Sequence, residues 1–119
     1  MALELYMVGL VTKDMEKSLE FYRRLGLALS EGNERHVKEK MESGVTFFLN
    51  APGRTEVADS ERVIFEFYLP SRAAVEQKHA ELTSFGYQSS RAPAFEPAIT
   101  VYFALVSDPD GHTIMLSAD

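Results

Sequence analysis

Runs of apolar and β-prone residues alternate with turn residues along this chain, and their spacing predicts two helices and eight strands. Each helix should lie between an N-cap and a glycine stop: residues 15–25 between Asp14 and Gly26, and residues 72–85 between Ser71 and Gly86. Strands are expected at residues 4–12, 27–30, 35–41, 45–50, 62–70, 87–91, 99–107 and 112–117. Residues 52–61 and 92–98 are interpreted as loops, the second being either a lid or a fixed connection.

The same order of elements occurs twice, as a strand, a capped helix and three strands. Each βαβββ half has about 60 residues, which is too short for a separate core, so both halves should share one. We therefore expect a single domain over residues 1–119, with module one at about 1–51, a loop at 52–61 and module two at about 62–119. The predicted class is α+β: two βαβββ modules form a cupped mixed β-sheet with the helices on its outer face.

Alternation along the four clearest strands separates an apolar face from a mixed face. The apolar face, expected to pack under the helices, holds Val8, Leu10, Phe47, Leu49, Phe65, Phe67, Ile114 and Leu116. The mixed face is typical of solvent exposure, of a subunit interface or of an apolar pocket with polar anchors. We favour the pocket, and its candidate ligand-binding residues are Met7, Phe48, Ile64, Glu66, Tyr68 and Met115.

Composition and charge narrow the function further. The net charge is −6 and basic residues form no cluster, so we expect no nucleic-acid partner. No run is long and apolar enough for a membrane span, and residues 1–11 lack the marks of a secretory signal, so a cytoplasmic location is expected. The absence of cysteine excludes disulfides, thiolate nucleophiles and zinc–thiolate sites.

Few ionisable residues fall where they could do chemistry. Glu66 is the one acid on the mixed face of these strands; it could bind a cationic group, act as a base or be a hydrated rim residue. The spacing of the three histidines is not that of metal ligands. We expect His36 to lie on an exposed strand edge, His79 to pack on the second helix, and His112 to cap the turn before the last strand. No nucleophile triad, P-loop or dinucleotide motif occurs, so no catalytic residue is assigned.

Two segments resemble motifs of the vicinal oxygen chelate superfamily, which includes glyoxalase I, extradiol dioxygenases and bleomycin-resistance proteins. They are VTKDMEKSLEFYRRLGL at 11–27 and DPDGHTIML at 108–116. With the paired modules, the resemblance covers essentially the whole chain. It implies a cupped sheet, a homodimer, and inward-pointing Phe103 and Leu105 that extend the apolar wall of the pocket.

The resemblance also implies one metal ligand, usually His or Glu, at four positions that are Met7, Phe48, Ile64 and Met115 here. Divalent cations prefer imidazole or carboxylate ligands, so we expect neither a metal nor another cofactor. The sequence thus predicts a metal-independent binding protein of the bleomycin-resistance-like branch. Its partner would be a small, partly aromatic ligand, cationic or neutral, which it sequesters. A glyoxalase-type lyase, isomerase or thiol transferase is the alternative, and a non-catalytic interaction module is a third hypothesis.

Overall fold

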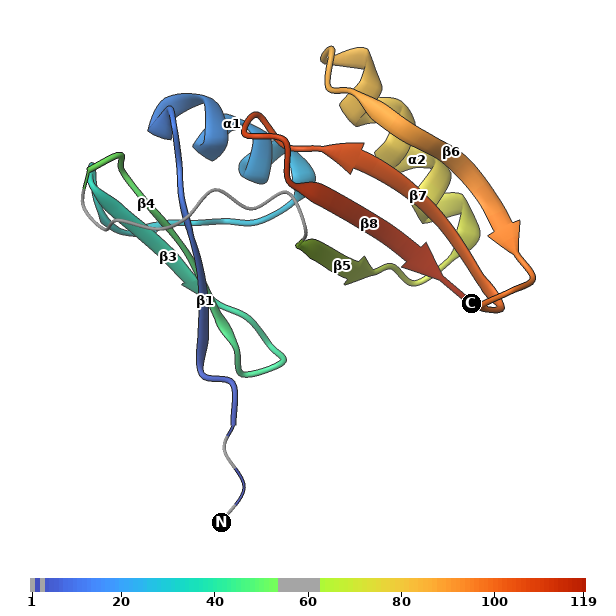
Figure 1. The fold of residues 1–119 in the computed structure, drawn as a ribbon, viewed down its shortest axis with the longest axis horizontal. Coiled ribbons are helices and arrows are strands. Elements are labelled where there is room, and N and C mark those ends of the chain that lie inside the picture. The colour runs from blue at the N-terminus through green and yellow to red at the C-terminus, as the bar shows by residue number, and fades with distance from the viewer. Residues whose placement is uncertain (1, 3, 54–62) are drawn as a thin grey trace. The chain divides into compact units, whose positions relative to one another are not determined.

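The computed structural model describes residues 2, 4–53 and 63–119, so most of the loop expected at 52–61 lies outside the described residues. Contacts divide the chain into two compact units, Met1–Ala58 and Asp59–Asp119 (Figure 1). Each unit holds one module. None of the helices in the described part of the chain has the length and apolar character required to span a membrane.

Module one comprises β1 (Met7–Val11), α1 (Met15–Leu25), β2 (Glu31–Asn33), β3 (His36–Lys40) and β4 (Thr46–Asn50). Its sheet has the order β1-β4-β3-β2, with β1 parallel to β4 and the other pairs antiparallel. The helix begins where predicted, because the Asp14 carboxylate accepts the amide of Lys17 at 3.1 Å. Gly26 ends it at φ 130°, a conformation that glycine adopts readily.

Module two comprises β5 (Ile64–Tyr68), α2 (Arg72–Ser84), β6 (Ser89–Glu96), β7 (Val101–Ser107) and β8 (Thr113–Ala118). Its order, β5-β8-β7-β6, repeats that of module one, again with one parallel pair. The Ser71 hydroxyl caps α2 by accepting the amide of Ala74. Figure 1 shows α2 lying along one face of this sheet, where it contacts β6, β7 and β8. The α+β class with two βαβββ modules is confirmed, and the strands form two four-stranded sheets.

In each sheet, one row of paired residues crosses all four strands. One row across module one runs Gly9, Phe48, Lys38 and Glu31 from β1 to β2. The matching row in module two runs Glu66, Met115, Leu105 and Arg91 from β5 to β6. Position by position, therefore, Gly9 corresponds to Glu66 and Phe48 to Met115.

The predicted apolar face forms the core of each module. In module one, the ring of Tyr22 from α1 lies 5.1 Å from the ring of Phe47, measured between centroids. In module two, Ile114 and Leu116 are at most 1% exposed, and Val75 of α2 is fully buried. The alternation of apolar positions correctly identified the side of each sheet that its helix covers.

The strand expected at residues 27–30 is absent, because its backbone groups bond to side chains instead of a neighbouring strand. The Glu39 carboxylate accepts the amides of Ala28 and Leu29, and Arg23 donates to the Leu29 carbonyl. Leu29 has φ 45°, which a strand does not allow. The strand near this position is β2, at Glu31–Asn33.

The loop expected at residues 92–98 is also wrong, since β6 extends through most of it. We expected proline to break a strand there. However, β6 is the edge strand of its sheet, and its pairing register shifts between Arg91 and Ala94, on either side of Pro93. Proline is tolerated at such an irregularity on an edge strand, so residues 92–96 belong to β6, and residues 97–98 lie in the turn that follows it.

Candidate functional site

Each sheet has a face turned away from its own helix, which we call its far face. All eight candidate ligand-binding residues lie on far faces: Met7 and Phe48 in module one, and Ile64, Glu66, Tyr68, Phe103, Leu105 and Met115 in module two. Glu66, Met115 and Leu105 occupy a single row on three neighbouring strands. The far face of module two therefore brings together six of the eight predicted residues, with an apolar centre beside one carboxylate.

The carboxylate in this row has a defined orientation. The hydroxyl of Ser117, which is 1% exposed, donates a 2.7 Å hydrogen bond to Oε2 of Glu66. Glu66 itself is exposed. One oxygen is thus fixed toward β8 while the rest of the carboxylate is accessible, a geometry suited to receiving a positively charged or hydrogen-donating group.

Tyr68, at the end of β5, is exposed, and its phenol is coupled to Asp119. A hydrogen bond to the Asp119 carboxylate raises the pKa of Tyr68 above its ordinary value of 10.0, and partial desolvation adds to the shift. Because the folded-state pKa is raised, this bond stabilises the fold below pH 10 and is lost as the pH rises through the folded pKa.

We expect Asp119→Asn to lower the pKa of Tyr68 toward its ordinary value, because the charged acceptor is removed. Ultraviolet titration of tyrosinate absorbance would measure this, with Tyr68→Phe assigning the signal among five tyrosines. Tyr102 is the internal control: its pKa is raised mainly by burial and by Glu76, and should not respond. An unchanged Tyr68 titration in the Asp119→Asn protein would contradict the coupling.

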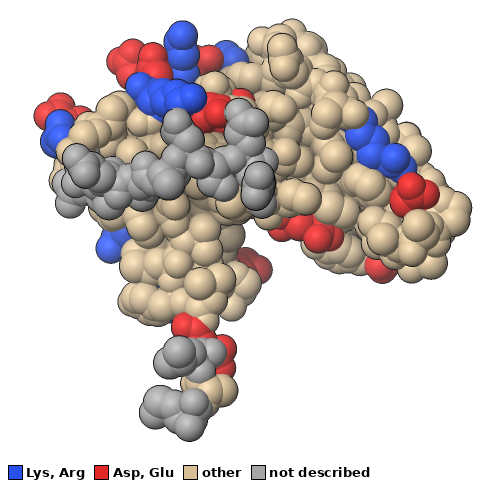
Figure 2. All heavy atoms as spheres, viewed as in Figure 1, with Lys and Arg blue, Asp and Glu red and all other residues tan. Residues whose placement is uncertain are grey.

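Arg91 is a functional candidate that the sequence interpretation missed. It lies at the β6 end of the row, opposite Leu105, and its guanidinium carbon is 4.2 Å from the centroid of the Phe103 ring. Figure 2 shows a blue patch over this part of module two, bordered mostly by uncharged atoms and by acidic atoms at one end. A signal was present in the sequence, since Arg91 is the one charged residue between Glu81 and Glu96.

The far face of module one is more polar and is organised around Phe48. The Phe48 ring lies over the backbone of Gly9, in the space that a side chain there would fill. His36 packs its ring 5.3 Å from that of Phe48, and its Nδ1 lies 2.6 Å from Oδ1 of the buried Asn50. The exposed edge expected for His36 is therefore wrong: it is half-buried, because pairing with β4 places it beside Phe48 and Asn50.

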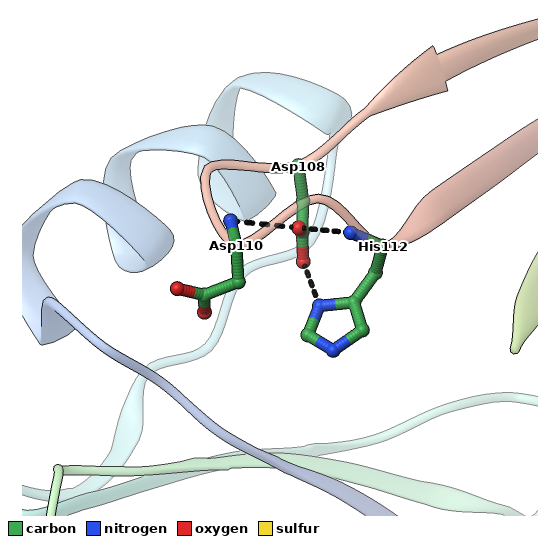
Figure 3. Close-up of polar contacts among 3 residues, drawn as sticks. All are labelled: Asp108, Asp110 and His112. Atoms are coloured by element: carbon green, nitrogen blue, oxygen red, sulfur yellow. Dashed lines mark hydrogen bonds and ion pairs between the residues drawn. The ribbon is translucent and has the colours of Figure 1, made fainter. Parts of the chain in front are cut away.

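Asp108, Asp110 and His112 gather in the turn between β7 and β8 (Figure 3). Oδ1 of Asp108 accepts the amides of Asp110 and His112, and Oδ2 lies 2.8 Å from Nδ1 of His112. Both Asp108 oxygens are thus occupied by the turn itself, and Asp110 joins through its backbone amide. This arrangement braces the turn, the role expected for His112, and leaves Asp108 poorly placed to bind a cation.

Comparison with known proteins identifies the class. The family model of the Glyoxalase/Bleomycin resistance protein/Dioxygenase superfamily matches residues 5–116. The chain belongs to this superfamily. A search of the curated proteins found no match.

Solved structures share the fold at low sequence identity. A glyoxalase-related enzyme from Fulvimarina pelagi has a TM-score of 0.83 at 21% identity, over 99% of this chain and 89% of that chain. Hypothetical protein SA1046 from S. aureus has a TM-score of 0.79 at 19% identity, over 100% and 95% respectively. A lactoylglutathione lyase from Agrobacterium tumefaciens has a TM-score of 0.74 at 18% identity, over 97% and 92%. These similarities establish the fold alone.

Proposed function

We propose that this protein binds and sequesters a small, partly aromatic ligand, cationic or neutral, without a metal. The observation that carries the proposal is the row on the far face of module two, where Met115 and Leu105 provide an apolar surface beside the Glu66 carboxylate. Apolar surface with a few convergent polar groups is the usual composition of a small-molecule site. Glu66 supplies the attraction for a cationic group.

The residues at the four metal-ligand positions of the superfamily do not fit a divalent cation. Met7, Phe48, Ile64 and Met115 offer two neutral thioethers and two hydrocarbon side chains. Mg²⁺, Mn²⁺, Fe²⁺ and Zn²⁺ prefer carboxylate oxygen or imidazole nitrogen. No metal-dependent step is therefore assigned to this chain. A lyase, isomerase or thiol transferase remains the alternative, and a homodimer located in the cytoplasm remains a prediction.

The proposal is tested by titrating ¹⁵N-labelled protein with 2-naphthylmethylamine, an aromatic cation, with and without a chelator. We expect amide shifts on β5, β7 and β8 that are the same under both conditions. Glu66→Gln should weaken binding roughly 10-fold, since it removes one charge-assisted contact. Glu81→Gln is the matched control, because Glu81 pairs with Lys78 on the surface of α2.

Two results would contradict the proposal. One is the absence of binding by 2-naphthylmethylamine at millimolar concentration. The other is one tightly held divalent ion per chain in protein purified without chelator, with added Ni²⁺, Zn²⁺, Mn²⁺ or Fe²⁺ raising the melting temperature. The second result would favour the enzyme alternative, and assays of glyoxalase and thiol-transferase activity would follow.

A further inference from the structure

We infer that the ligand of the far face of module two is zwitterionic: an anionic group binds Arg91 and a cationic group binds Glu66, with an apolar body between these two groups of the ligand. This inference rests on the proposed function and adds a second charge of opposite sign to the ligand. Arg91 is its new element. The two charged residues occupy the two ends of one row of the sheet, with Met115 and Leu105 between them.

The guanidinium of Arg91 has unused hydrogen-bonding capacity. Its Nε is buried without a hydrogen-bond partner, and its Nη2 makes one long bond of 3.4 Å to the Ala94 carbonyl. No acid among the described residues lies within ion-pair distance of it. A buried donor without a partner is rare in proteins, and it favours a state in which an acceptor is supplied. A carboxylate of the ligand can supply one through two parallel hydrogen bonds.

Phe103 holds the guanidinium over the far face. The ring is 9% exposed, and the guanidinium carbon 4.2 Å from its centroid forms a cation–π contact. The charge is therefore located above β7, within the predicted site. Phe103 contributes by positioning Arg91, and Leu105 and Met115 provide apolar surface in the adjoining row of the same face.

Arg91 and Glu66 carry opposite charges on the same face, yet they do not form an ion pair with each other. Each is held by a neighbour: Arg91 by Phe103 on β7, and Glu66 by Ser117 on β8. Phe103 and Ser117 are paired across these two strands. Adjacent strands lie about 5 Å apart, so the charges are separated by roughly 5–10 Å, or one to two strand spacings. A molecule with charges at opposite ends of an aromatic ring system spans this gap.

The test compares three naphthalene probes with the same ring system. These are 2-naphthylmethylamine with a positive charge, 2-naphthoate with a negative charge, and 6-(aminomethyl)-2-naphthoate with both. The dissociation constant of each would be measured by NMR titration of the full chain. We expect the zwitterionic probe to bind at least about 10-fold more tightly than either single-charge probe, because both charge-assisted contacts form.

Arg91→Met should weaken binding of the zwitterionic probe about 10-fold. It should not weaken binding of 2-naphthylmethylamine, because Arg91 carries the same charge as that probe and offers it no attraction. Arg91→Lys should retain part of the affinity, since it keeps the charge without the planar fork. Arg72→Met is the matched control: Arg72 also lies over aromatic rings of module two, those of Phe95 and Tyr102. It removes the same charge without touching the row.

The outcomes separate the inference from the function on which it rests. If all three probes bind and Arg91→Met behaves like Arg72→Met, the inference is overturned and the proposed function stands. If 2-naphthylmethylamine and the zwitterionic probe bind equally well, Arg91 does not bind an anionic group, and the inference is likewise overturned. If none of the probes shifts the amides of β5, β7 or β8, the proposed function fails and the inference fails with it.

Discussion

Leu116→Ala should lower the free energy of unfolding by about 2–5 kcal/mol, the usual cost of truncating a leucine in a well-packed core. Leu116 is 1% exposed and lies on the helix face of β8. Its neighbour Phe67 on β5 and the buried Ala104 on β7 pack on the same side. Removal of its branched side chain leaves a cavity that these strands cannot close without breaking their pairing. Urea denaturation followed by circular dichroism would measure the change.

Met115→Ala, one residue earlier in β8, is the matched control. Met115 is half-buried on the far face, so its truncation should cost about 1 kcal/mol or less. It should instead weaken binding of 2-naphthylmethylamine, because it removes part of the apolar surface. Equal destabilisation by the two substitutions would mean that the far face is part of the core, as in a buried subunit interface, and the binding proposal would lose its basis.

The contrast between Leu116 and Met115 tests a prediction made from the sequence, namely which face of β8 packs under the helix. Alternation of apolar residues located the helix face, and the caps Asp14 and Ser71 located both helix starts, because these signals depend on residues close together in the chain. The errors occurred where distant side chains decide the backbone. Residues 27–30 are held by Glu39, and the strand through Pro93 depends on its place at the edge of the sheet.

The candidate site was predicted in part for the same reason. Alternation along the strands placed Glu66 and Met115 on one face. It does not predict which residue of one strand lies opposite which residue of the next strand. Arg91 entered the site only through its pairing with Leu105 and its contact with Phe103. A register shift on each side of Arg91 makes that pairing unpredictable from alternation alone.

Comparison of the two modules shows that Phe48 does more than replace a metal ligand of the superfamily, because its ring also restricts the neighbouring strand. In module one the ring of Phe48 covers the backbone of β1, and the residue beneath it is Gly9. In module two Met115 occupies the position of Phe48, and Glu66 occupies that of Gly9. A flexible thioether leaves room for a side chain on the neighbouring strand, whereas a flat ring does not. The carboxylate of the proposed site therefore depends on the residue at position 115.

Gly9→Ala should destabilise the protein by about 1–3 kcal/mol, since the added methyl group would overlap the Phe48 ring and displace it from His36. In a Phe48→Ala background, the same substitution should stabilise the protein instead. With the ring gone, alanine is favoured over glycine in a strand by roughly 0.5–1 kcal/mol, because it loses less backbone freedom on folding. Thermal and urea unfolding of the four proteins would complete this double-mutant cycle.

The sign reversal distinguishes a specific overlap from a general intolerance of substitution in β1. If Gly9→Ala destabilises both backgrounds equally, the cost arises from the backbone of β1 and not from the ring. If it destabilises neither, Phe48 does not lie over Gly9 in solution. The space above β1 would then be free, and module one would have room on its far face for a ligand of its own.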